Sequence, residues 1–310
     1  MMNIMRLFPV LLLISPLFGT PPSTSYPDEP DAAVRFVANQ LAAMNGEVLW
    51  DALPESYQAD ITNLAKRSSE KIDAENYGRT FVLLARIAGL IENKSDFICH
   101  TKLGGGLPEE SLPEIKRALP LLSTLLRDFS TGAISTHAGL QDFDGRVFFE
   151  EFTTGLLRFI EASANLDAAS TFSISDLASL EVKVVDQDVN TASLETVLPG
   201  SAPEREDYVR VEDRWLPLPF AEMWGAEISK ANSSLQAVTA EQVNANKVQA
   251  GMILGILEGV MSQIEGADSQ ESFDRALQGA VIPIMGMLMM GGDSGLGSGN
   301  PAAQDAVTAP

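Results

Sequence analysis

The chain has 310 residues, of which 42 are acidic, 21 are basic and one is a cysteine, and its formal net charge is −21. Such an excess of negative charge repels phosphate backbones and anionic lipid headgroups, so no nucleic acid partner is expected. A single cysteine cannot form an intramolecular disulfide, so packing alone must hold the fold together.

Residues 1–25 have the pattern of a secretory signal peptide. A short basic start is followed by the apolar run from Leu7 to Phe18 and then by small and proline-rich residues. A membrane anchor is the alternative, but the run has about a dozen residues where a span needs about 20. We therefore expect cleavage between Thr20 and Tyr26. The sequence predicts an exported protein, periplasmic or secreted, with no stable membrane span after signal cleavage.

Residues 26–170 form a predicted N-terminal helical region. Apolar residues recur every three or four positions in five stretches, which begin near Val34, Pro54, Asp73, Ser111 and Gly145. Asp73 is expected to cap the third helix, and Ser111 has capping-box spacing before the fourth. Pro120 is expected to kink that helix or split it in two.

The hydrophobic period then changes from helical to alternating. Residues 181–185, 191–198 and 207–212 are rich in β-branched or alternating apolar residues. Turns are expected around Asp186 to Asn190 and around Pro199 to Pro203. The pattern predicts a three-stranded antiparallel meander from about 180 to 216, which must pack on helices because three short strands are not stable alone in water.

The end of the meander carries a family resemblance. Residues 208–217 place Trp215 after an acidic turn. Residues 180–217 thereby resemble the closing strands of small exported NTF2-like domains. More broadly, the chain resembles uncharacterised exported bacterial helical proteins with a Trp-ended β-meander. The resemblance implies no activity.

The meander and the C-terminal helices together make up residues 171–290. Thr239 to Gln242 has capping-box spacing, and the helix that follows has Gly251, Gly255 and Gly259 on one face. Glycines at this spacing let another helix approach closely, so these three form a candidate helix-contact face. A second capped helix follows from about Asp268 and ends in a methionine-rich apolar run. Residues 291–310 are expected to be a disordered tail.

Three interpretations of this C-terminal helical hairpin remain open. The simplest is that it packs against its own protein, with methionines filling gaps. The second is self-association or binding of a protein partner, because methionine-rich helices form adaptable contact surfaces. The third is membrane insertion, although the uninterrupted apolar stretches are too short for a span.

No residue pattern predicts a metal or a cofactor. Cys99, His100 and His137 are of the types that bind transition metals, but closed zinc sites need four ligands. The adjacent side chains of Cys99 and His100 are also not expected to point the same way. Residues 186–190 and 142–145 match only the first positions of a calcium loop, and turn chemistry is the simpler explanation. Cys99 is expected to be an inert core residue.

Catalytic residues remain unknown from the sequence. No G-x-S-x-G elbow is present, and two groups of carboxylates, Glu150 with Glu151 and Glu204 with Glu206 and Asp207, are expected to lie on solvated faces. The three tryptophans are expected to pack in the core rather than to form a ligand cage, and they are Trp50, Trp215 and Trp224.

The sequence as a whole predicts an α+β, predominantly α-helical fold. We expect an exported, non-catalytic protein that acts in binding or assembly through its helical surfaces. The alternative is a periplasmic or secreted enzyme, hydrolase-like, whose site is gathered from distant residues. A buried carboxylate with a perturbed pKa would favour the enzyme. An exposed apolar patch on the hairpin of residues 248–290 would favour assembly.

Overall fold

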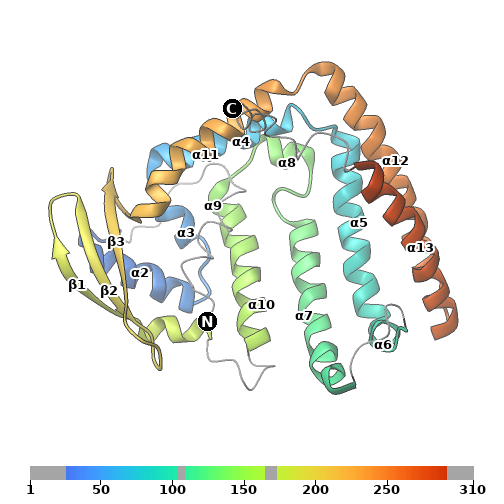
Figure 1. The fold of residues 1–310 in the computed structure, drawn as a ribbon, viewed down its shortest axis with the longest axis horizontal. Coiled ribbons are helices and arrows are strands. Elements are labelled where there is room, and N and C mark those ends of the chain that lie inside the picture. Colours follow the sequence, from blue (N-terminus) through green and yellow to red (C-terminus); the bar gives the residue numbers. More distant parts are fainter. Residues whose placement is uncertain (1–25, 103–108, 165–172, 292–310) are drawn as a thin grey trace, which may run out of the picture.

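The computed structural model describes residues 26–102, 109–164 and 173–291, with side chains up to Ala280. The predicted signal peptide and nearly all of the predicted tail lie outside these residues. As predicted, the fold is α+β and mostly helical, with one antiparallel sheet. Figure 1 shows the sheet at one end of the molecule and helices α12 and α13 at the other, with α10, α7 and α5 side by side between them.

The N-terminal region contains the five predicted helices and several short ones between them. In chain order they are α2 Pro30–Ala42, α3 Val48–Asp51, α4 Glu55–Ser69, α5 Ala74–Asn93, α6 Ser95–Cys99, η3 Glu109–Ser111, α7 Leu112–Thr131, α8 His137–Gln141, α9 Gly145–Phe148, η4 Phe149–Thr153 and α10 Thr154–Ala164. A further 3-10 helix, η5 Ile174–Ser179, precedes the sheet.

The predicted helix caps have different outcomes. Asp73 caps α5 as predicted, since its Oδ1 accepts the Asn76 backbone N–H at 3.0 Å. The predicted capping box at Ser111 is wrong, because this side chain makes no capping hydrogen bond. Pro120 lies inside α7, which continues on both sides of it, so the helix is not split. Pro113 lies in the first turn of α7, where its missing N–H has no helical partner to lose.

The fifth predicted helix is interrupted by a π-helical turn at η4. This turn lies against Gly46, where a Cβ atom would stand only 2.6 Å from the Phe149 carbonyl oxygen. The Gly46 N–H also donates to Thr154 Oγ1 at 3.2 Å. Glycine at position 46 therefore lets the chain after α2 touch the backbone of η4 directly.

The sheet has four strands, where three were predicted. Its strands are β1 Glu181–Gln187, β2 Thr191–Val197, β3 Glu204–Val211 and β4 Arg214–Pro217, and their spatial order is the same as their chain order. The extra strand arises because the chain reverses at Glu212, whose φ of 54° lies in the left-handed region. The Glu212 carboxylate accepts the Ser56 backbone N–H at 3.5 Å, which ties this turn to α4.

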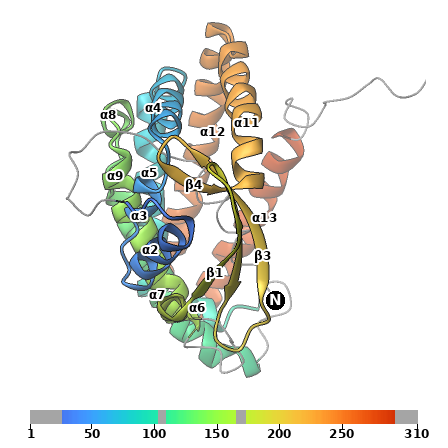
Figure 2. The ribbon, with the colours of Figure 1, turned by 90° about the vertical axis from the view of Figure 1, so that its left-hand side faces the viewer.

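The two faces of β4 contact two different cores. Consecutive strand residues point to opposite faces, so Trp215 packs with the sheet and α2, while Leu216 packs with the helices. The Trp215 indole N–H donates to the Asp28 carbonyl oxygen at 2.7 Å. Figure 2 shows α2 beside the sheet.

The largest core is aromatic, and we call it the aromatic core. It joins buried residues of α3, α4, α5, α8, α9 and η4 to β4 and α11, and its fully buried members include Phe143, Phe149 and Leu216. Tyr57 of α4 and Trp224 of α11 stack on one another with ring centroids 4.1 Å apart. This core therefore joins residues from both halves of the chain.

Three long helices complete the chain, namely α11 Leu218–Ala237, α12 Ala240–Glu265 and α13 Gln270–Gly291. The predicted capping box at Thr239 is present, with hydrogen bonds in both directions between Thr239 and Gln242. Helix α12 packs on α5 and on α13, which forms the predicted hairpin. Among the described residues, none of the helices combines the length and the apolar character that crossing a membrane requires.

Candidate functional site

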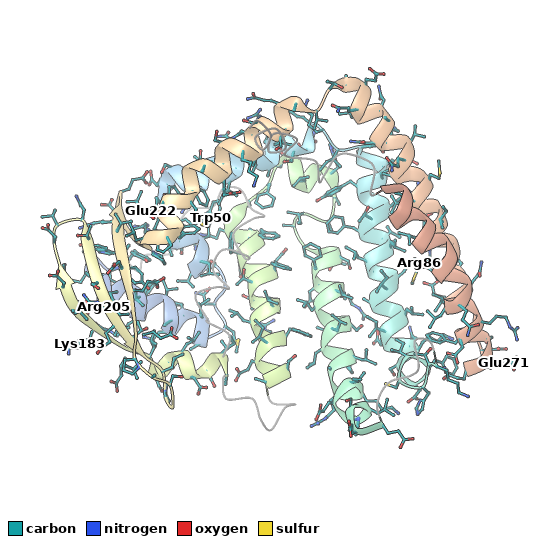
Figure 3. The ribbon with its side chains drawn as sticks, viewed as in Figure 1. Trp50, Arg86, Lys183, Arg205, Glu222 and Glu271 are labelled. Atoms are coloured by element: carbon teal, nitrogen blue, oxygen red, sulfur yellow. The ribbon has the colours of Figure 1, made fainter. Side chains whose placement is uncertain are left out.

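The inner face of α12 is attached to α5 by ion pairs and one small apolar cluster. Arg79 pairs with Glu258 at 2.8 Å and Arg86 with Glu265 at 2.7 Å, and each guanidinium donates two hydrogen bonds to its carboxylate. These bonds hold the pKa values of both carboxyls below their usual range. Both pairs advance in the same direction, so the two helices run parallel. Figure 3 shows Arg86 between them.

A third ion pair and the apolar cluster complete this contact. Lys247 Nζ lies 2.7 Å from Asp73 Oδ2, at the first turn of α5. Leu83 of α5 is buried against Leu254 and Met261 of α12. The charged residues of α12 between Asn244 and Gln263 are Lys247 and Glu258, and both are used in this attachment.

The outer face of α12 is exposed and uncharged. Val248 is 67% exposed, Met252 61% and Ile256 36%. Gly255, Gly259 and Gln263 are exposed on the same side. We call these six residues the outer face of α12. Three of the exposed large apolar side chains thus lie together on one helix of a chain with net charge −21.

The three glycines of the candidate helix-contact face have different surroundings. A Cβ on Gly251 would lie 3.3 Å from Asn76 Oδ1, and one on Gly255 would lie 3.9 Å from Arg79 Nη2. A Cβ on Gly259 would meet no described atom within 4 Å. Side chains of α5 therefore approach Gly251 closely and Gly255 more loosely, whereas Gly259 is open toward solvent.

A second candidate site lies on the inner face of the sheet. Burial raises the pKa of the Glu206 carboxyl, although a hydrogen bond with Tyr208 opposes this shift. Its Oε2 atom is buried and has no hydrogen-bond partner among the described residues. Burial also raises the pKa of Tyr26, here to about 12, while Arg214 stacks over its ring at 4.5 Å. Sequence reasoning placed Glu206 on a solvated face and missed this burial.

A partly buried charge network lies between the sheet and the aromatic core. Arg146 pairs with both Glu47 and Asp51, and the Arg214 Nε–H donates to the Asp51 carbonyl oxygen at 2.7 Å. Burial raises the pKa of the Asp51 carboxyl more than Arg146 lowers it. This network joins α3, α9 and β4.

The other carboxylates named in the sequence analysis are not brought together. Glu150 and Glu151 are exposed on η4, and Glu151 accepts the Ala133 backbone N–H at 2.7 Å. Asp188 forms part of the β1–β2 turn, where it accepts the Val189 N–H at 2.8 Å. Asp144 caps α9 through the Val147 N–H. The turn and cap roles predicted for the aspartate clusters are confirmed.

The cysteine and the histidines also lie apart. Cys99 is buried, as predicted, and burial raises the pKa of its thiol. His137 Nε2 is 2.9 Å from the Ser69 carbonyl oxygen, whereas His100 Nδ1 is 2.7 Å from that of Asp96. In the described ranges, three or more histidine, cysteine, aspartate or glutamate side chains do not gather in a way that could hold a metal ion.

The three tryptophans pack with the cores, as predicted. Trp50 and Trp215 are buried, and a Cβ on Gly145 would stand 2.5 Å from the Trp50 ring. Trp224 is partly buried, and its indole N–H donates to Asp60 Oδ2 at 3.0 Å.

No family model, no curated protein and no solved structure matches this chain. The resemblance to NTF2-like domains therefore stays a prediction.

Proposed function

We propose that this is an exported, non-catalytic protein that acts in binding or assembly through the outer face of α12. The exposed row Val248, Met252 and Ile256 carries the proposal. Adjacent exposed apolar side chains mark a candidate contact surface, because apolar area exposed to water costs about 25 cal/mol per Å² relative to burial.

The attachment of α12 supports this proposal. The ion pairs to α5 fix the rotation of α12 about its axis, so the same residues always face outward. A surface presented on a fixed helix is better ordered for binding than one on a loop, because less conformational freedom is lost on contact.

A second candidate function, a hydrolase-like enzyme, is favoured by one observation, the raised pKa of the half-buried Glu206. General acid catalysis needs such a protonated carboxyl within reach of substrate. The neighbouring ionisable groups are the phenols of Tyr208, which hydrogen-bonds to Glu206, and of Tyr26. The pKa of each phenol is raised, so both stay neutral. Glu206→Gln would abolish an enzymatic activity of this site and leave contacts of α12 unchanged.

Site-specific photo-crosslinking in the producing cells tests the proposed function. A benzophenone amino acid at position 252 is expected to give a crosslinked product. The matched control is position 189 in the β1–β2 turn, where Val189 is also apolar and is 79% exposed. Equal labelling at both positions, or no product at 252, would contradict the proposal.

Export is tested in the same cells by sequencing the amino terminus of the released protein, which is expected to begin between residues 20 and 26.

A further inference from the structure

We propose that the outer face of α12 binds a second copy of this chain, in an antiparallel two-fold contact. The inference rests on the proposed function and names its partner. In such a contact both copies use the same patch. If one residue of the first copy touches another residue of the second copy, the same two residues also touch with the copies exchanged.

The order of large and small residues along α12 fits this arrangement. If the two-fold axis passes between Gly255 and Ile256, then Met252 of one copy lies opposite Gly259 of the other. Ile256 then lies opposite Gly255, because both pairs have the same sum of residue numbers. Met252 and Ile256 thus each meet a glycine, while Val248 lies opposite Gln263. A Cβ on Gly259 would meet no described atom within 4 Å, and one on Gly255 would lie 3.9 Å from Arg79 Nη2.

The helix interior gives an independent reason to expect a neighbour at these glycines. A glycine inside a helix is less stable than alanine by about 1 kcal/mol. Contact with α5 accounts for Gly251, where a Cβ would lie 3.3 Å from Asn76 Oδ1. Nothing described within one chain occupies the space at Gly259, and a close helix crossing between copies would use it.

Charge favours this face over others for self-association. A chain with net charge −21 repels its own copy over most of its surface. The outer face of α12 contains no charged residue, and it lies at the opposite end of the molecule from the sheet (Figure 1). Contact along it brings neutral residues together and places the two acidic bodies on opposite sides of the axis.

The size of the face predicts a weak dimer. The outer face from Val248 to Gln263 spans about 24 Å of helix, and a helix about 10 Å wide then offers roughly 240 Å² per chain. Stable complexes bury about 800 Å² per partner, so we expect a concentration-dependent equilibrium between one and two chains.

Analytical ultracentrifugation of the purified full chain tests the dimer. The mass is expected to rise from that of one chain at low-micromolar concentration toward that of two at high concentration. Met252→Glu should keep the mass at one chain throughout, because it places two like charges in the contact. Val82→Glu, on an exposed apolar residue of α5, is the matched control and should leave the equilibrium unchanged. A wild-type chain that stays monomeric, or a dimer that survives Met252→Glu, would overturn the inference.

Engineered cysteines test the register. Oxidation of a mixture of Met252→Cys and Gly259→Cys chains is expected to give mixed disulfide dimers, while either variant alone gives few. A parallel contact would give the reverse and would overturn the antiparallel arrangement. The unmodified chain is the control, since its Cys99 is buried.

The crosslinking at position 252 separates this inference from the proposed function. A product with the mass of two chains supports both. A product with a different protein or with lipid, and none with the mass of two chains, supports a contact role and overturns the second copy as its partner. No product contradicts both.

Discussion

The aromatic core and the α12–α13 hairpin are stabilised in different ways. The aromatic core buries large side chains from both halves of the chain, and Phe149 within it is fully buried. The hairpin instead packs on α5 and α6 through partly exposed ion pairs and small apolar clusters around Leu254 and Phe273. Burial of large rings contributes several kcal/mol each, whereas partly exposed ion pairs contribute about 1 kcal/mol or less. The hairpin should therefore open locally before the body of the protein unfolds.

The largest effect is expected from Phe149→Ala. It removes a fully buried ring in contact with Trp50 and Phe148, and such substitutions lower the free energy of unfolding by about 3–5 kcal/mol. Denaturant titration followed by tryptophan fluorescence measures the change. The control Val82→Ala, on a side chain that is 62% exposed, should change it by less than about 0.5 kcal/mol. Equal effects of the two variants would show that the aromatic core is not the main source of stability.

A smaller and local effect is expected from Leu254→Ala. This residue is buried between α12 and α5, and its truncation should cost about 2 kcal/mol, near the lower end for leucine, because the small cluster can relax around the cavity. Hydrogen exchange measured by mass spectrometry should show faster exchange in α12 and α13. Amides of η4 and β4 should keep their protection, and a uniform loss across the chain would refute the separation of the two regions.

Glu206→Gln should stabilise the sheet end at neutral pH. The folded protein raises the pKa of this carboxyl, so its contribution to stability is fully present below the unfolded pKa and is lost as the pH rises through the folded value. The amide removes a charge whose Oε2 lacks a partner among the described residues, which should add about 1 kcal/mol at pH 7. Melting curves across acidic and neutral pH test this, and the gain should vanish in acid. A gain independent of pH would mean that titration is not its cause.

The smallest effect is expected from Gly259→Ala at concentrations where the chain is monomeric. Alanine fits without a clash and is favoured over glycine in a helix by about 0.5–1 kcal/mol. Gly251→Ala is the matched control, where the 3.3 Å approach to Asn76 Oδ1 should cancel part of this gain. Thermal unfolding of both variants is the measurement. A destabilising Gly259→Ala would indicate a contact at this position within a single chain.

Local sequence patterns predicted the main helices and two of their caps. Features that depend on contacts between distant segments, such as the fourth strand, were not predicted. Asp73 and Thr239 were recognised because a cap acts on residues three positions away. The reversal at Glu212 was missed because a non-glycine residue with positive φ has no clear sequence signal, and its turn is tied to Ser56 of α4.

The outer face of α12 was likewise predictable only in part from local sequence patterns. The uncharged run from Val248 to Leu257 was visible in the sequence, but which side of it faces solvent was not. The sequence contained one usable signal of the contact between α5 and α12. Arg79 and Arg86 on α5 are seven residues apart, and so are their partners Glu258 and Glu265 on α12. Glu206 gave no signal, because its burial depends on the register of β3 against β2.

The position of β4 between two cores also has a consequence for the order of folding. Arg214 and Leu216 complete contacts with residues near Asp51, so the aromatic core joins segments more than 160 positions apart in the chain. During synthesis the early helices must wait for these residues to emerge from the ribosome before their largest core can close. Contacts of such long range slow folding. A chain built in this way completes its largest core only late in its synthesis, and a chain with an open core is what a secretion channel would accept under the proposed export.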